Sequence, residues 1–547
     1  MKSTHLLYSF LKAHLKDGLL TLLFLGICAS GFAQVSGTVV DDKSNETLIG
    51  ASILIKGATD GTATDIDGKF SISNAKQGDV LVVSYTGYNT AEVTVGNEST
   101  MEIRLSQGIS LDEVVVTGYA TQTRGDITGS VASVDMLEAV KTPVVNAGEA
   151  LQGRVTGVQV VTNANPGEAP KINIRGFGTS NNTNPLFIID GVQTDDPNAL
   201  NNLNPDDIDQ MNVLKDGAAA IYGARASNGV VIVTTKGGGY NMDKPVVTFN
   251  AYTGYSELSN KPGLLNAQQH ADMIWQSLSN DGVATEHPQY GSGSSPVLPS
   301  SIIGYTRVES YDPITFAAPG VYNATVTPGG TDWIDAVTET APLSNVSLGV
   351  SNGGKNGKYY LSAGYLSRDG ILTNTGFQRA SMKVNSEFRF ADRVKIGQHM
   401  NLAYTDRNNG VSEAIENASR ITPLLPVTDD DGNYTGVAGP GLSNTRSPAA
   451  QLDRTKDNFN KRFSLFGDAY ISIDIMDGLT AKTVLAGGFN TTDTRAFTAL
   501  DPEHGEPIST NTLNEQNQTA NNWNWTNTLN YRKSFGDHYI NVIAGVE

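Results

Sequence analysis

The second half of the chain alternates apolar and polar residues with a period of two over long stretches. Because successive side chains of a strand point to opposite faces, this period predicts β-strands with one apolar and one polar face. In residues 393–405 the apolar positions are Val394, Ile396, Met400, Leu402 and Tyr404, and the polar ones are Arg393, Lys395, His399, Asn401 and Thr405. Nine such stretches follow residue 245, at 246–255, 345–351, 358–367, 380–390, 393–405, 461–475, 479–489, 522–532 and 538–546.

These strands are expected to form a transmembrane β-barrel. Most reach the roughly 9–11 residues that a tilted transmembrane strand needs. Long polar insertions alternate with short turns at 390–393 and 476–478, which is the asymmetry of outer-membrane barrels. Aromatic residues that suit interfacial girdles stand at Tyr255, Tyr404, Trp523 and Tyr531. A soluble β-rich domain with one solvent-exposed face remains the alternative, since alternation alone does not distinguish such a domain from a transmembrane barrel.

The N-terminal part of the chain carries shorter elements. Six strand candidates separated by turn signals such as Asp67-Gly68 predict a β-sandwich. They cover 34–40, 52–56, 69–73, 80–85, 91–95 and 101–105. Residues 126–239 mix strand-like runs with short helices near 147–151 and 218–222, and end in a strand at 229–235 and three glycines. This mixture predicts one α+β domain.

Charge and hydropathy limit the classes of partner and the kind of membrane segment that the chain can have. The formal net charge of −18 over 547 residues argues against nucleic acid as a partner. The hydrophobic content of 39% and mean hydropathy of −0.23 suit a soluble protein, but alternating lipid-facing and lumen-facing residues average out to such values. No run of 18 apolar residues follows residue 33, so no transmembrane helix is predicted.

The sequence offers no catalytic or metal-binding pattern. Its seven histidines are dispersed without the spacing of a metal site, and we expect no enzyme activity, metal or cofactor. Residues 429–433 resemble the start of a calcium loop but lack its glutamate at position 12. We therefore expect a polar turn there.

The N-terminus has the pattern of a secretory signal. Basic residues precede the apolar segment 19–27, and Ala33 ends a small-residue site before Gln34, where cleavage is expected. A lipoprotein signal ending at Cys28 is the alternative, although Ile27 is bulky for such a site. Cleavage at Gln34 would remove the only cysteine.

A short β-prone peptide lies between the two folded segments. It reads Leu111, Asp112, Glu113, Val114, Val115, Val116, Thr117, Gly118 and Tyr119. One interpretation is a last strand of the sandwich or an ordinary linker. The other is a docking peptide that adds itself as a strand to the sheet edge of another protein.

In this order, the pieces resemble a TonB-dependent transporter of the SusC/RagA family. The motifs ALQGRVTGVQVV, INIRGFG, PLFIIDGV and NVLKDGAAAIYGARASNGVVIVTTKGG are similar to those of its plug, and LDEVVVTGYATQ is similar to its TonB box. The segment from VSGTVVDDKS to GKFSIS resembles the carboxypeptidase-regulatory-like domain, a transthyretin-like fold. That domain name implies no peptidase, because residues 35–106 contain no histidine to bind zinc.

The resemblance implies a mainly β protein with five segments. These are a signal peptide at 1–33, the transthyretin-like sandwich at 34–107, the TonB box at 111–119, an α+β plug at 126–239 and a partial antiparallel barrel at 245–547. Plug motif residues would be Arg154, Arg175, Gly176, Asp190, Gly191, Lys215, Asp216, Tyr222, Gly223, Arg225 and Gly229. Among them Arg154, Arg175 and Arg225 are candidates for ion pairs between plug and barrel wall, with solvated or internally paired arginines as the alternative.

The family also implies a function and partners. TonB, energised through ExbB–ExbD, would pull the plug and admit a nutrient across the outer membrane of a Gram-negative, Bacteroidota-like cell. A SusD-like surface lipoprotein would capture the cargo, most often oligosaccharide and otherwise peptide. Trp275 and Trp333 could stack on sugar rings, although the spacing of 267–278 favours an amphipathic helix that buries Trp275. A surface glycan-binding protein or a signalling receptor without transport remains the rival interpretation.

Nine strands are too few for such a barrel. A barrel of about eight strands is filled by its own side chains, and plugged transporters need about 22. The plug candidate, with a radius of gyration of roughly 13 Å, would not fit. We therefore expect the sequence to be the N-terminal part of a longer protein.

Overall fold

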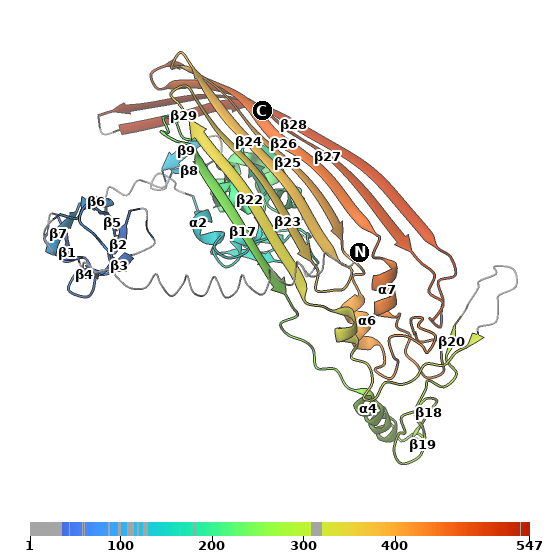
Figure 1. Cartoon of the computed structure of the whole chain (residues 1–547). Coiled ribbons are helices and arrows are strands. Elements are labelled where there is room, and N and C mark those ends of the chain that lie inside the picture. Colours follow the sequence, from blue (N-terminus) through green and yellow to red (C-terminus); the bar gives the residue numbers. More distant parts are fainter. Residues whose placement is uncertain are drawn as a thin grey trace, which may run out of the picture. The chain divides into compact units, whose positions relative to one another are not determined.

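The computed structural model describes residues 35–547 except 43, 57, 59–60, 86–87, 97–99, 107–113, 118–119, 124–128, 163–164, 180–181, 308–319 and 537 (Figure 1). The predicted cleavage site at Ala33 and Gln34 lies outside the described residues. The described chain forms two compact units. The first runs to Val114 and includes Thr123, and the second holds the rest from Val115 onward.

The first unit contains a β-sandwich. One sheet has the order β4 (Lys69–Ile72), β1 (Val35–Asp41), β7 (Thr100–Leu105), and the other has the order β3 (Gly61–Ala63), β2 (Ser52–Ile55), β5 (Val80–Ser84), β6 (Ala91–Thr94). Buried side chains between them include Val39, Ile53, Leu81 and Ile103. All six predicted strands are present. Strand β3 was missed because its Gly-Thr-Ala sequence has no apolar alternation to reveal it.

Part of the predicted docking peptide is a strand. β8 (Val114–Thr117) pairs with β9 (Ala120–Thr123) in a two-stranded sheet of its own, so it is not a strand of the described sandwich sheets. Leu111, Asp112, Glu113, Gly118 and Tyr119 lie outside the described residues.

An α+β domain, called the plug below, opens the second unit. Its five-stranded sheet has the order β10-β15-β16-β13-β14, and β11 pairs with β12. The bounds are β10 (Val131–Asp135), α2 (Met136–Ala139), η2 (Glu149–Leu151), β11 (Val158–Val161), β12 (Lys171–Ile174), β13 (Leu186–Ile189), β14 (Val192–Thr194), α3 (Asn198–Asn201), η3 (Pro205–Asp207), β15 (Ile208–Leu214), η4 (Asp216–Ala226) and β16 (Val230–Thr235). Phe187, Leu200, Met211 and Val231 are fully buried in its core. The predicted α+β mixture is therefore present.

The predicted helix at 218–222 takes a different form. It belongs to η4, a 3-10 segment that is interrupted at Gly223, where φ is +71°. Only Ala219 and Ala226 of this segment are buried, so its small residues offer no apolar stripe to hold a regular α-helix. Gly229 follows the segment with φ of +88°, a conformation that favours glycine, and a Cβ there would lie 2.7 Å from the terminal side-chain carbon of Ile174.

A nine-stranded antiparallel sheet, called the wall below, follows the plug (Figure 1). Its strands pair in sequence order: β17 (Val246–Ser256), β22 (Ala341–Gly353), β23 (Gly357–Asp369), β24 (Gly376–Phe390), β25 (Val394–Asn408), β26 (Phe459–Met476), β27 (Leu479–Thr498), β28 (Thr512–Phe535) and β29 (His538–Val546). Every predicted strand is present, and most extend beyond the predicted ends because their flanking polar residues still pair.

The wall has an apolar exposed face. One row of paired residues crosses seven strands through Phe249, Leu348, Ala363, Met382, Leu402, Leu465 and Phe489. Within it Phe249 is 69% exposed and Met382 is 48% exposed. At about 4.8 Å between strands, the row is roughly 29 Å long.

The opposite face of the wall is polar and buried. Its side chains include Asn345, Ser347, Arg379, Lys383 and Asn401, each at most 6% exposed. A soluble sheet buries its apolar face, whereas a lipid-exposed barrel has apolar residues outside and polar ones within. This polarity excludes the soluble alternative. Among the described helices, none is long and apolar enough to cross a membrane.

Three long connections lie at one end of the wall. They span 257–340, 409–458 and 499–511, and their described parts are called the loop cluster below. The cluster contains α4 (Ala267–Asn280), β18 (Glu286–His287), β19 (Gly291–Ser292), β20 (Thr306–Arg307), β21 (Gly320–Val321), α5 (Trp333–Val337), α6 (Ala414–Arg420) and α7 (Pro448–Arg454). Short turns join the strands at the other end, as the sequence predicted.

Candidate functional site at the interface of plug and wall

Asp190 is the plug motif residue that the structure brings to the wall. With Gly191 it forms the two-residue turn between β13 and β14, and both residues have positive φ, as a type I′ turn requires. Its Oδ2 accepts a 2.6 Å hydrogen bond from Lys383 Nζ on β24. Both side chains are buried, at 4% and 1% exposure. Thr235 completes the site by donating its backbone N–H and its hydroxyl to the Asp190 carboxylate, at 2.8 and 2.7 Å.

The pKa values of two plug carboxylates at this interface are shifted in opposite directions. Burial alone would raise the pKa of Asp190, but the adjacent Lys383 ammonium and the bonds from Thr235 outweigh it and lower that pKa. For Asp207, burial outweighs the hydrogen bond from Tyr360 and raises the pKa. The difference follows from the partner, since only Asp190 has a cation in direct contact.

Acid should weaken the contact made by Asp190. Its folded-state pKa is lowered, so the stabilisation is present above the unfolded value of about 3.9 and is lost as the pH falls through the folded value. In Asp190→Asn the neutral side chain lacks this dependence. We therefore expect the unfolding free energies of the wild type and Asp190→Asn to differ at pH 7, and the difference to shrink as the pH falls below about 3.9. Urea titrations across this range measure the difference, and a constant difference would contradict the assignment.

A second contact group lies on η3. Asn204 caps this turn through its side chain, which places Asp206 and Asp207 against the wall. Asp206 accepts hydrogen bonds from Ser347 Oγ at 2.6 Å and from Asn250 Nδ2 at 2.9 Å. Tyr360 Oη donates to Asp207 Oδ1 at 2.8 Å. Sequence reasoning missed these acids, although their position after Asn-Pro, a turn signal, was available.

Cations of the wall bind the loops of the plug. Arg379, 2% exposed, donates from Nη1 to the carbonyl oxygens of Val145 and Asn201 at 3.1 and 3.0 Å. Arg462 pairs with Asp196 at 2.7 Å. The contacts are therefore spread over strands β17 to β26 and join groups far apart in the sequence.

The arginines predicted to bridge plug and wall do not do so in the described structure. Arg175 pairs with Asp216 of the plug at 2.6 Å, and both are more than half exposed. Arg154 binds Thr142 and the carbonyl of Ala150, and Arg225 is exposed. Across the interface with the nine described strands of the wall, the cations belong to the wall and the acceptors to the plug.

Three further motif residues have contacts or backbone angles inside the plug. Lys215, 5% exposed, donates to the carbonyl of Thr156 at 2.6 Å. Tyr222 packs against a small cluster that includes Leu186 and Val230. Gly176 has φ of +92°, a conformation that favours glycine.

The loop cluster is a packed unit with its own core. Trp333 is 1% exposed and donates its indole N–H to the Thr422 carbonyl at 3.1 Å, and Trp275 is 5% exposed on α4. The helix predicted around Trp275 is confirmed. The hypothesis that these two tryptophans stack on sugars is wrong for the described structure, because both side chains fill the core.

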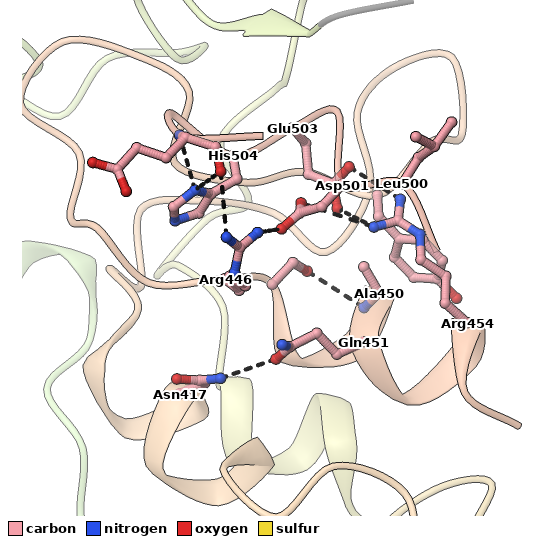
Figure 2. Close-up of polar contacts among 12 residues, drawn as sticks. Asn417, Arg446, Ala450, Gln451, Arg454, Leu500, Asp501, Glu503 and His504 are labelled. Atoms are coloured by element: carbon pink, nitrogen blue, oxygen red, sulfur yellow. Dashed lines mark hydrogen bonds and ion pairs between the residues drawn. The ribbon is translucent and has the colours of Figure 1, made fainter. Parts of the chain in front are cut away.

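Ion pairs join the third long connection to the second (Figure 2). Arg454 of α7 binds Glu503 through both terminal nitrogens, at 2.7 and 3.0 Å, and the Glu503 side chain is fully buried. Arg446 pairs with Asp501. In the same cluster, Asp429 closes the expected polar turn by accepting the backbone N–H groups of Asp431 and Asn433.

Known families match two parts of the chain. A family described as the TonB-dependent Receptor Plug Domain matches residues 123–230, and the CarboxypepD_reg-like domain matches residues 35–116. A TonB-dependent receptor of Formosa agariphila is 33% identical over 526 residues, which cover 93% of this chain and 48% of that protein. The TonB-dependent receptor SusC of Bacteroides thetaiotaomicron is 34% identical over 441 residues, or 77% of this chain and 39% of SusC.

Solved structures agree with these relatives. The RagAB peptide importer in its open-open state matches with a TM-score of 0.64 and 25% identity, over 79% of this chain and 48% of that chain. The chain thus spans about half the length of the relatives it matches. With plug, sandwich and lipid-compatible antiparallel sheet all present, the chain belongs to the SusC-like TonB-dependent receptors, a family of outer-membrane β-barrel proteins.

Proposed function

We propose that the protein imports an oligosaccharide nutrient across the outer membrane by TonB-driven displacement of its plug. The observation that carries this proposal is the polar interface between plug and wall, with Asp190–Lys383 and Asp206–Ser347 among its contacts. Interfaces between parts that move are more polar than permanent ones. Hydrogen bonds of this kind can be exchanged for water once the plug is pulled.

TonB supplies the work in this mechanism. The outer membrane has no energy source of its own, so the inner-membrane proton gradient acts through ExbB–ExbD and TonB. Residues 111–119 join the TonB sheet as an added strand, a mode in which main-chain hydrogen bonds provide affinity. The extended backbone of Val114–Thr117 supports this role. Pulling then displaces or partly unfolds the plug inside the barrel.

In this proposal a second protein captures the cargo. A SusD-like surface lipoprotein at the outer end of the barrel binds the oligosaccharide and passes it to the plug. The 34% identity to SusC favours this partner. Peptide is the second candidate cargo, because the structural neighbour RagAB is a peptide importer.

Removal of residues 111–119 from the full-length receptor tests the mechanism. We expect uptake to be abolished and ligand binding at the cell surface to persist, because the deletion lies in neither the plug nor the wall. Labelled oligosaccharide measures both quantities on intact cells. Unchanged uptake would refute the proposal.

A point variant provides the matched comparison. Val115→Pro removes one backbone N–H and interrupts strand addition, whereas Val115→Thr keeps a β-branched residue. Uptake should fall in the first and persist in the second. Growth of a receptor deletion strain on a panel of glycans and peptides then identifies the cargo class.

A further inference from the structure

A cavity of about 230 Å³ lies between plug and wall. Asn198, Asn201 and Asn202 line it from the plug, and Arg407, Asn460 and Arg462 line it from the wall. Arg407 is near the end of β25 and Asn460 near the start of β26, so the cavity lies toward the end of the wall that carries the loop cluster. A ligand that arrives through the loops would meet this part of the interface first.

Two arginines give the lining of the cavity a positive charge. Arg462 is balanced by Asp196 at 2.7 Å. Arg407 donates one 3.3 Å hydrogen bond to the Gly167 carbonyl. Glu168 interacts favourably with its charge, but among the described residues Arg407 forms no ion pair. The lining residues themselves include two arginines and no acid.

Two buried polar atoms beside the cavity lack a hydrogen-bond partner. They are Oδ1 of Asn201, a residue only 5% exposed, and Nε of Arg462. Buried polar groups are nearly always paired, so these atoms indicate that the cavity takes a polar occupant. The occupant should therefore supply one donor for Asn201 and one acceptor for Arg462, and should face the Arg407 guanidinium, which has no direct ion pair.

We propose, building on the import function above, that this cavity receives one acidic sugar unit of the cargo, whose carboxylate binds Arg407. A guanidinium matches a carboxylate through two parallel N–H bonds. The amide and hydroxyl groups that line the rest of the cavity can both donate to and accept from sugar hydroxyls. Sites for drug-sized ligands measure about 300–1,000 Å³, so this cavity accommodates a single unit of an oligosaccharide.

The test compares sugars that differ only in charge. Trisaccharides of uronic acids are each supplied as the free acid and as the methyl ester, and binding is measured on cells that carry the full-length receptor with its energy supply uncoupled. We expect the wild type to prefer the free acid. In Arg407→Gln, affinity for the acid should fall about 10- to 100-fold while affinity for the ester stays within about twofold. Arg407→Lys should recover only part of the loss, because the lysine ammonium cannot donate two parallel N–H bonds to one carboxylate.

Controls separate this inference from the import function and from misfolding. Arg393→Gln removes the same charge at an exposed turn at the other end of the wall and should leave both affinities unchanged. An equal loss for acid and ester in Arg407→Gln, or no loss for either, would overturn the acidic subsite while leaving import intact. Binding of acidic peptides but of no trisaccharide would overturn both the subsite and the saccharide cargo.

Discussion

Lys383→Met should destabilise the packing of the plug against the wall by about 3–5 kcal/mol. The substitution removes the cation that faces Asp190 at 2.6 Å, where both side chains are buried. The Asp190 carboxylate would keep its hydrogen bonds from Thr235 but would lose its cation in a site with little water, and that uncompensated buried charge is the main part of the effect. Urea titration of the full-length receptor in detergent measures the loss, with hydrogen exchange of β13 and β16 reporting on the plug.

The exposed pair Arg175–Asp216 is a control of equal length. It also spans 2.6 Å, but its side chains are 55% and 53% exposed, so Arg175→Met should change stability by only about 0–1 kcal/mol. The double variant Asp190→Asn/Lys383→Met removes both charges and should recover a large part of the loss. If Lys383→Met were no more harmful than Arg175→Met, the buried pair would not hold the plug.

The wall could be predicted from the sequence because its signal is local. Alternation in a stretch such as 393–405 specifies a strand and its two faces without any knowledge of its neighbours. The same pattern placed Asn401 on the polar face and Tyr404 on the apolar face, and the structure buries the first and exposes the second. The number of strands in the complete barrel stays a prediction.

The contacts between plug and wall could not be predicted in the same way. Lys383 and Asp190 are 193 residues apart, and which polar residue meets which depends on the register of the sheet and the position of the plug. Sequence motifs identified Asp190 but also suggested arginines of the plug as the bridging cations. A motif identifies a residue but not its partner. Arg175, for example, forms its ion pair inside the plug.

The loop cluster shows another limit of local patterns. Its polar insertions suggested exposed loops that could offer Trp333 to sugars, because apolar residues are sparse in any short window. In the structure, residues from two distant connections meet in one core, with Trp333 beside Ala418 and Leu424 in a single cluster. Only the amphipathic spacing of α4 predicted part of this core from the sequence.

Arg454→Met should unfold the contact between the second and third long connections. It leaves the fully buried Glu503 carboxylate without its two-pronged partner, and loss of one member of a buried pair costs about 3–5 kcal/mol. Arg446 still binds Asp501, so one ion pair between the two connections remains. The effect should therefore stay within the loop cluster. Limited proteolysis and hydrogen exchange of residues 499–511 in the full-length receptor measure it, and exchange in the plug should not change.

The comparison variant lies in the same cluster and removes the same side chain. Arg420 pairs with Glu416 at 2.6 Å on the surface of α6, at 67% and 52% exposure, and Arg420→Met should cost no more than about 0.5 kcal/mol. A large effect of Arg454→Met beside a small effect of Arg420→Met would show that burial, and not the number of ion pairs, makes the loop cluster one unit. Equal small effects would mean that the third connection is held to the second without the buried pair.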